Sequence, residues 1–130
     1  VWATASGRAG FTVPPGLSGL GRPLAAGELT LVTLRSNDQF NTTVYGFQDR
    51  LRGLKGDRMV VLLSPTEIAR AGLREGERVT LACAHDDGHR RAVEGLRVVA
   101  YDLPEGCAAA YYPETNPLVP VGLRDAMSKT

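Results

Sequence analysis

The stretch RMVVLLSPTEIARAGLREGERVTLACA, residues 58–84, decides the fold, because it places one short helix between two strands. Residues 58–63 are a near-continuous apolar run, which predicts a buried strand. Residues 78–84 alternate between Val79, Leu81, Cys83 and more polar neighbours, the pattern of a half-buried strand. The chain therefore mixes strands with short helices.

The helix signal between these strands has a clear start and end. Ser64 can cap the helix, Pro65 fits its first position, and Glu67 completes a capping box. Gly72 stands where a left-handed C-terminal cap belongs. We expect a helix of only a few residues.

Further strand signals lie on both sides of this unit. Residues 28–35 (ELTLVTLR) are rich in Leu and β-branched residues. Asp86-Asp87-Gly88 predicts a hairpin turn, after which residues 90–94 return antiparallel. The remaining predicted strands cover residues 96–101, 107–112 and 118–121.

Together these signals predict a mainly β domain with short helices. A closed or nearly closed β-barrel would leave no exposed edge in such a set of short strands. Residues 1–27 are rich in Ala, Gly and Pro, which predicts an irregular linker with a short strand at Phe11–Val13. We expect the barrel domain over residues 28–130. The chain starts without Met and stops without a tapering tail, so we expect it to be a fragment of a longer polypeptide.

Composition excludes several classes of function. A net charge of +1 without a dense run of Lys or Arg argues against nucleic-acid binding. No apolar run reaches the length of a membrane span, and no secretory signal opens the chain. Cys83 and Cys107 lack the spacing of a zinc site, so we expect free thiols in a cytoplasmic protein.

The sequence contains no recognisable catalytic group or metal site. His85 and His89 flank the predicted hairpin turn, where exposed surface residues are expected. The motifs GxSxG, GxGxxG and Walker A are absent. Asp102 and Glu105 are a loop pair that solvation explains. We therefore predict that this domain performs no catalysis by itself.

Two polar segments are the candidate binding elements, LRSNDQFNTTVYG at residues 34–46 and YYPETNPLVP at residues 111–120. Each follows a predicted strand, and polar side chains held at strand ends are a common way to build a ligand site. The predicted binding residues are Arg35, Ser36, Asn37, Gln39, Asn41, Glu114, Thr115 and Asn116.

The chemistry of the first segment suits an anionic or heterocyclic ligand. Arg35 offers a planar fork for phosphate or for the edge of a heterocycle. Ser36 and Asn37 have the composition of an anion-binding nest, and Gln39 and Asn41 carry both donors and acceptors. The alternative is a polar turn whose side chains cap their own backbone.

The second segment is stiffened by prolines on both sides. Pro113 and Pro117 fix the backbone around Glu114, Thr115 and Asn116, and the position before Pro117 favours an extended conformation for Asn116. A rigid loop binds a ligand with little loss of entropy. The alternative is a proline-stiffened connector.

At these residues the chain resembles the C-terminal dinucleotide-binding domain of molybdopterin-dependent oxidoreductases, in particular the branch of formate-dehydrogenase-like alpha subunits. The resemblance is carried by Gly7-Arg8-Ala9 with Phe11, by LVTLRSNDQFNTTVYG, by SPTEIARAGLREGERV with YYPETNPLVPV, and by Ser128-Lys129-Thr130. Together these stretches span nearly the whole chain.

The resemblance implies a double-psi β-barrel that binds bis-molybdopterin guanine dinucleotide, carrying molybdenum or tungsten, in the full-length enzyme. Arg35, Ser36, Gln39 and Asn41 would then lie against the pterin and phosphate region, and Asn116 would approach a pterin, with Glu114 and Thr115 as neighbours. The N-terminal catalytic domains of the same polypeptide would be the partners, and they would supply the metal ligand and any iron–sulfur cysteines.

Two other classes of function stay open at this point. One is a stand-alone double-psi barrel that acts as an adaptor or substrate-recognition module, because related barrels serve in that way. The other is a small self-contained enzyme, which would need an activated nucleophile or an acid–base pair. An adaptor does not require the loops of Arg35 and Asn116 to converge, so their relative placement separates the readings.

Overall fold

The computed structural model describes residues 3–10 and 23–122. Its elements, in chain order, are β1 (Thr30–Leu34), β2 (Gln39–Phe40), β3 (Thr43–Val44), β4 (Val60–Leu63), α1 (Pro65–Arg70), β5 (Arg78–Ala82), β6 (Ala92–Ala100), β7 (Cys107–Tyr111) and the 3-10 helix η1 (Asn116–Leu118). The prediction of a mainly β fold with short helices is confirmed. Neither helix has the length or hydrophobicity to cross a lipid bilayer, within the described residues.

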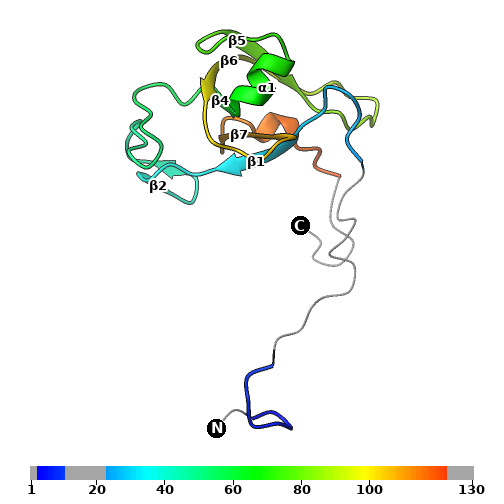
Figure 1. The fold of residues 1–130 in the computed structure, drawn as a ribbon. Coiled ribbons are helices and arrows are strands. Elements are labelled where there is room, and N and C mark those ends of the chain that lie inside the picture. Colours follow the sequence, from blue (N-terminus) through cyan, green and yellow to red (C-terminus); the bar gives the residue numbers. More distant parts are fainter. Residues whose placement is uncertain (1–2, 11–22, 123–130) are drawn as a thin grey trace.

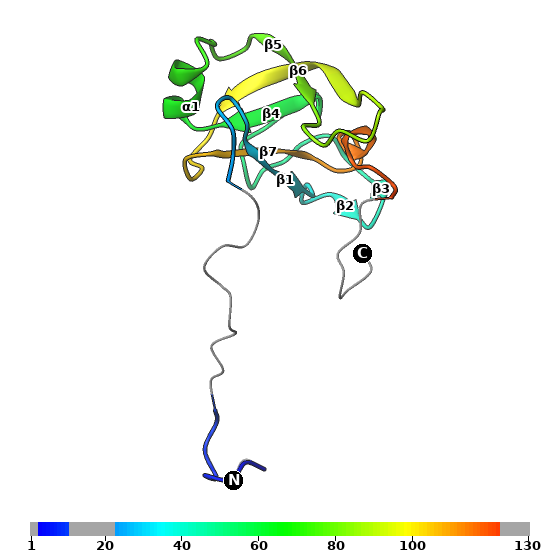
Figure 2. The ribbon, with the colours of Figure 1, turned by 90° about the vertical axis from the view of Figure 1, so that its right-hand side faces the viewer.

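The strands form a five-stranded mixed sheet in the order β1-β7-β4-β6-β5, and β2 pairs with β3 in a separate hairpin. Figures 1 and 2 show this sheet with α1 at one end and the β2–β3 hairpin projecting from the other. β1 runs parallel to β7 and β4 parallel to β6, whereas β4 with β7 and β5 with β6 are antiparallel. In the part of the chain that the structure describes, β1 and β5 are open edges, so closure into a double-psi barrel is not confirmed.

β4 is the centre of the core. All four of its residues are buried, because β7 and β6 flank it and side chains cover both of its faces. Val61 and Leu63 pack on one face, in a cluster with Leu96 and Val98, while the alternate residues pack on the other face with Tyr111. This burial on both faces explains the unbroken apolar run in the sequence.

α1 begins and ends where the sequence predicts. The Glu67 N–H donates to Ser64 Oγ at 3.1 Å, and Pro65 occupies the first turn. Gly72 has φ 66°, and its N–H and that of Leu73 donate to Ala69 O and Ile68 O, the two bonds of a Schellman motif.

The expected second half of the capping box is wrong. The buried Glu67 carboxylate accepts from the Gly106 N–H at 2.8 Å and pairs with Arg70. It is not bonded back to the N–H of Ser64. The helix is thereby attached to the turn before β7, a long-range contact that the local pattern does not contain.

The hairpin around Asp86-Asp87-Gly88 is confirmed, since β5 and β6 pair antiparallel across it. The two strands expected at residues 90–94 and 96–101 are one strand, β6. Gly95, with φ 74°, lies where the β5–β6 register shifts, so it forms a bulge within the strand. The glycine therefore bends β6 without ending it.

Two further predictions concern segments near the candidate site. The strand expected at residues 118–121 is wrong, because successive i→i+3 bonds from Leu118 to Thr115 and from Val119 to Asn116 form η1. The β2–β3 hairpin was not predicted. The expected strand at Phe11–Val13 lies outside the described residues.

Candidate functional site

The two polar segments leave the sheet side by side. In the parallel pairing of β1 with β7, Leu34 is the partner of Tyr111, and each is the last residue of its strand. The Tyr112 N–H donates to Leu34 O at 2.9 Å and extends the pairing by one bond. Arg35 and Tyr112 therefore start the two segments from the same point, although they lie far apart in the sequence. Ligands commonly bind at the carboxyl ends of neighbouring strands.

Arg58 joins the two segments. Its side chain, 3% exposed, donates to Ser36 Oγ at 2.5 Å and to Gln39 Oε1 at 2.9 Å on the first segment. On the second segment it donates to Tyr112 O at 2.6 Å and forms a two-point ion pair with Glu114, at 2.6 and 3.0 Å. A guanidinium presents its donors in a fixed plane, so these contacts define the relative position of the loops.

The guanidinium of Arg58 also lies over an aromatic ring. Its Cζ is 4.6 Å from the centroid of the buried Tyr111 ring. This cation–π contact covers one face of a charged group that is otherwise surrounded by acceptors. Within the described residues, no buried side-chain nitrogen or oxygen lacks a hydrogen-bond partner.

Gln39 makes the second link between the loops. Its Nε2 donates to Tyr112 O at 2.8 Å and to Asn41 O at 3.0 Å. Asn41 has φ 53°, a left-handed conformation that Asn tolerates better than most residues. The amide of Gln39 therefore holds the tight turn of the β2–β3 hairpin against the second segment.

A third connection runs beneath these loops through Tyr111 and Asp49. The Tyr111 hydroxyl donates to Asp49 Oδ2 at 2.6 Å, and Arg52 pairs with the same oxygen at 2.5 Å. Arg52 also donates to Arg35 O at 3.2 Å, so the network reaches the end of β1.

The network shifts the pKa values of both acidic groups. Burial raises the pKa of Asp49, but the hydrogen bonds from Tyr111 and Arg52 outweigh it, so the pKa lies below its ordinary value. Burial, followed by the hydrogen bond to Asp49, raises the pKa of the Tyr111 hydroxyl. Asp49 is therefore an ionised acceptor and Tyr111 a neutral donor at neutral pH.

The structure divides the eight predicted residues into two groups. Four are buried or half-buried and bond to Arg58 or to the end of β7, namely Ser36, Gln39, Glu114 and Thr115. The other four present side chains at the surface of the loops, fully or in part, namely Arg35, Asn37, Asn41 and Asn116.

The surface group is itself positioned by contacts. The Arg35 guanidinium carbon lies 5.8 Å from the centroid of the Tyr112 ring, so the residues that directly follow β1 and β7 contact each other. Asn37 Oδ1 accepts from the Arg50 N–H at 2.9 Å. The extended conformation expected for Asn116 is wrong, because Asn116 is the first residue of η1. The turn-forming bonds there override the preference imposed by Pro117.

Sequence reasoning missed Arg58, Asp49 and Arg52. Arg58 was assigned only as the start of an apolar strand, and the other two lie in a loop. An arginine two residues before a fully buried strand is a signal that could have identified Arg58, because a buried guanidinium needs acceptors from elsewhere in the fold.

Exposed cationic residues outnumber the one exposed acidic residue, Asp38, over residues 34–55, which contain the first polar segment. Arg35, Arg50 and Lys55 form no ion pair within the described residues, whereas Arg58 and Arg52 are neutralised by Glu114 and Asp49. Within the described residues, no group of three or more His, Cys, Asp and Glu side chains is arranged so that it could hold a metal ion. The donor set is suited to an anionic, hydrogen-bonding ligand.

A separate cavity of about 680 Å³ lies at the other end of the sheet. Its walls are mostly apolar and come from the segment before β1, from α1 and from β5. None of the eight predicted residues lines it. The candidate site is therefore the loop surface at the ends of β1 and β7.

Comparison with known proteins identifies relatives of the chain. A sequence profile described as "Molydopterin dinucleotide binding domain" matches residues 29–127. An uncharacterized oxidoreductase of Mycobacterium tuberculosis is 51% identical over 132 residues, covering 98% of this chain and 16% of the relative. Protein YdeP of Escherichia coli is 38% identical, covering 98% of this chain and 17% of the relative. The chain thus spans about a sixth of the length of these curated relatives. No solved structure matches it significantly.

Proposed function

Because the chain belongs to the molybdopterin dinucleotide binding domain family, we propose that its two polar segments form one wall of the cofactor site of a molybdenum or tungsten oxidoreductase. The observation that carries this proposal is the set of bonds from Arg58 to Ser36 and Glu114, which holds both segments together at the ends of β1 and β7. A stand-alone adaptor has no need for such a convergence.

The donor set fits bis-molybdopterin guanine dinucleotide. Arg35 would pair with phosphate oxygens, since a guanidinium binds them at two points. The amides of Asn37, Asn41 and Asn116 would bond the donor and acceptor edges of the pterins. Ser36, Gln39, Glu114 and Thr115 would hold the loops in place from beneath, because their polar atoms are already engaged.

The proposed division of labour leaves no chemical step to this domain. When bound, the cofactor supplies a metal centre that exchanges electrons with a substrate. The residues of this chain orient the cofactor and balance its negative charge. The metal ligand and the substrate channel would come from N-terminal domains of the same polypeptide, so the domain alone would turn over no substrate.

Two finer points belong to the same proposal. The mixed, non-sequential strand order supports most of a double-psi barrel, whose open edges β1 and β5 would be paired in the full-length protein. An experimental structure of the full-length protein in which β1 and β5 stay unpaired would refute that closure.

We also extend the proposal to formate as the substrate, on the resemblance of residues 34–46 and 111–120 to formate-dehydrogenase-like subunits. Reduction of an artificial electron acceptor on addition of formate tests this extension. A cofactor-loaded enzyme that is inert toward formate would remove the substrate assignment while leaving the cofactor site intact.

The decisive experiment uses the full-length protein produced with molybdate or tungstate available. Metal content is measured by elemental analysis, and guanine nucleotide is released by acid and quantified. We expect about two nucleotides per metal, as a bis-dinucleotide cofactor requires. A folded preparation with neither metal nor guanine nucleotide would overturn the proposal.

A further inference from the structure

A group of exposed apolar side chains lies next to the candidate site. Tyr45 is 76% exposed, Leu51 70%, Phe40 69% and Phe47 64%. We call these four residues the hairpin patch. They come from the β2–β3 hairpin and the loop that follows it, which project together from one side of the sheet (Figure 1). Side chains of this size concentrated in one short segment are typical of a protein interface.

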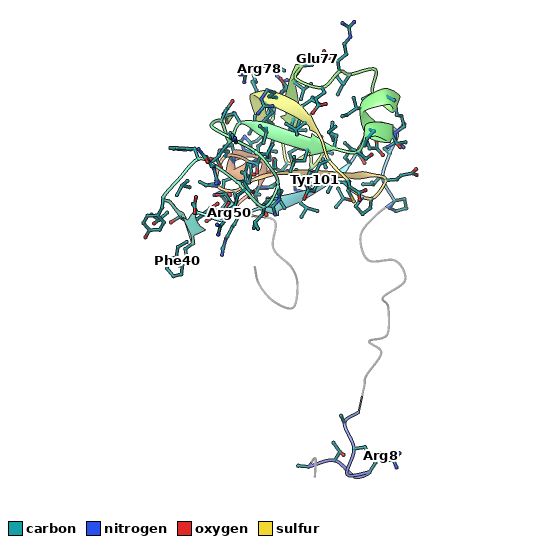
Figure 3. All side chains as sticks on the ribbon, turned by 60° about the vertical axis from the view of Figure 1, so that its left-hand side comes forward. Arg8, Phe40, Arg50, Glu77, Arg78 and Tyr101 are labelled. Carbon is teal, nitrogen blue, oxygen red and sulfur yellow. The ribbon has the colours of Figure 1, made fainter. Side chains whose placement is uncertain are left out.

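The geometry of the hairpin explains why its aromatic residues face outward. Gln39 is paired with Val44 and points inward to Tyr112 O. Side chains alternate between the two faces of a strand, so Phe40 points away from the protein. The Tyr45 N–H bonds to Asp38 O, which extends the ladder and places Tyr45 on the same outer face as Phe40. Figure 3 shows Phe40 at the outer end of the hairpin, directed away from the sheet.

The exposure of these side chains does not result from a loosely held loop. Gln39 ties the hairpin to the second polar segment, and Asp49 pairs with Leu54 in an isolated bridge while accepting from Tyr111. The outward direction of the patch is therefore fixed by the same network that builds the candidate site.

Cationic residues accompany the patch. Arg50 and Lys55 are exposed and lie in the same loop as Leu51, and neither forms an ion pair within the described residues. A complementary surface would be apolar at its centre and would carry carboxylates at its margin.

We propose that the hairpin patch docks onto an apolar surface with an acidic margin in another domain of the same oxidoreductase. The length of the relatives supports this occupant. They contain the region that matches this chain as only 16% to 17% of their length, so most of each relative lies outside it. This inference rests on the proposed function in one respect, namely that the partner is a domain of the same oxidoreductase.

Docking at the hairpin patch would also affect the proposed cofactor site. Phe40, in the patch, lies directly between Gln39, which holds the loops together, and Asn41, a proposed cofactor residue. A domain docked on the patch would cover the open side of the candidate site and would exclude water from it. The hairpin would then lie between the second polar segment on its inner side and the neighbouring domain on its outer side.

The test measures the accessibility of single cysteines in the full-length protein. Tyr45→Cys and Phe47→Cys report on the patch, and Leu24→Cys, 44% exposed here and located before β1, is the control. Each variant is treated with N-ethylmaleimide, and the modified peptide is quantified by mass spectrometry, in the folded state and in urea.

We expect labelling at positions 45 and 47 to be slowed at least about tenfold by folding, and labelling at position 24 to be slowed much less. Labelling at positions 45 and 47 as fast as at position 24 would overturn the proposal, since the patch would then be free in the full-length protein. Protection that disappears on dilution would assign the patch to a second copy and would also overturn it.

The acidic margin is tested separately with the double variant Arg50→Glu and Lys55→Glu. We expect faster labelling at positions 45 and 47 in this background, because like charges would then face each other. Unchanged labelling would refute the acidic margin.

Cofactor content of the same samples separates this inference from the proposed function. Protection without any cofactor would support the docking surface and count against the cofactor role. Bound cofactor without protection at positions 45 and 47 would support the cofactor role and count against the docking surface.

Discussion

Arg58 and Glu114 form a two-point ion pair, with Nε 2.6 Å from Oε1 and a terminal nitrogen 3.0 Å from Oε2, across 56 positions of sequence. The side chain of Arg58 is 3% exposed and that of Glu114 is 20% exposed. The pair connects the start of β4 with the second polar segment. Its loss would therefore affect the position of a loop as well as the stability of the fold.

We predict that substitutions of Arg58 and Glu114 have strongly non-additive effects on the free energy of unfolding. Removing one partner of a buried pair leaves the other charge unsatisfied, so Arg58→Met should lower the free energy of unfolding by about 3 kcal/mol. Glu114→Gln should lower it less, because the amide oxygen of Gln can still accept from Arg58 and the guanidinium keeps its bonds to Ser36, Gln39 and Tyr112. A double-mutant cycle by urea unfolding should give a coupling energy of about 1–3 kcal/mol.

The comparison for this cycle is Arg78→Met. Arg78 and Asp57 are 3.8 Å apart with both side chains largely exposed. We expect a change of less than about 1 kcal/mol there. Strictly additive effects of Arg58→Met and Glu114→Gln would show that the observed ion pair has no energetic consequence.

Because some site residues lie at the surface and others are buried, we predict that some variants lose cofactor binding and others lose stability. In the full-length enzyme, Arg35→Ala should weaken cofactor binding about tenfold, since it removes charged hydrogen bonds, while the melting temperature of the cofactor-free protein stays unchanged. Gln39→Ala should lower that melting temperature, because it removes bonds to Tyr112 O and Asn41 O. Guanine nucleotide content and thermal unfolding of the cofactor-free protein are the two measurements. Equal effects of both variants on both quantities would contradict the division.

Asp49 should make stability depend on pH in the acid range. Its pKa in the fold lies below the ordinary value of 3.8 because hydrogen bonds from Tyr111 and Arg52 outweigh burial. The ionised form therefore stabilises the fold above about pH 4, and this contribution is lost as the pH falls through the lower pKa of the folded state. The stability difference between the wild type and Asp49→Asn should shrink as the pH falls below about 4.

The measurement is urea unfolding across this pH range. Asp87 titrates in the same window, since its hydrogen bond from Arg91 lowers its pKa to about 2. Asp87→Asn is therefore the background in which the Asp49 comparison is made. A difference that stays constant with pH would mean that Asp49 does not titrate as described.

Gly72 should be sensitive to substitution at the end of α1. Its φ of 66° is strained for alanine, although an added Cβ would meet nothing within 4 Å. Gly72→Ala should lower the free energy of unfolding by about 1 kcal/mol, and Gly72→Asn should lower it less, because Asn tolerates this region. Thermal or urea unfolding of both variants provides the check. An alanine variant as stable as the asparagine variant would show that backbone strain is not the cause.

The elements that sequence reasoning identified have local signals. β4 is marked by four consecutive buried apolar residues. α1 is marked by Ser64 and Pro65 at its start and by Gly72 just after its end, and each of these acts on the helical turn next to it. β5 is marked by alternation. In each case the information lies in neighbouring residues.

The features that sequence reasoning missed depend on contacts across the fold. η1 forms where a strand was expected, and the carboxylate of Glu67 turns to Gly106. Arg58 acquires its role only when β1, β4 and β7 are assembled, because its partners come from residues 36, 39, 112 and 114. Composition predicted the two polar segments as binding elements, and the structure shows that they leave neighbouring strands side by side; the distinction between their surface and buried residues needed coordinates.

The pairing of Leu34 with Tyr111 has a consequence for how this domain can change over evolution. Both loops begin directly after this residue pair, so the distance between their first residues is set by the spacing between two neighbouring strands. The long excursion of chain between them passes through the tip of the β5–β6 hairpin, on a different part of the sheet. That tip could gain or lose residues without altering the distance between Arg35 and Tyr112, which makes it the natural place for lineage-specific insertions.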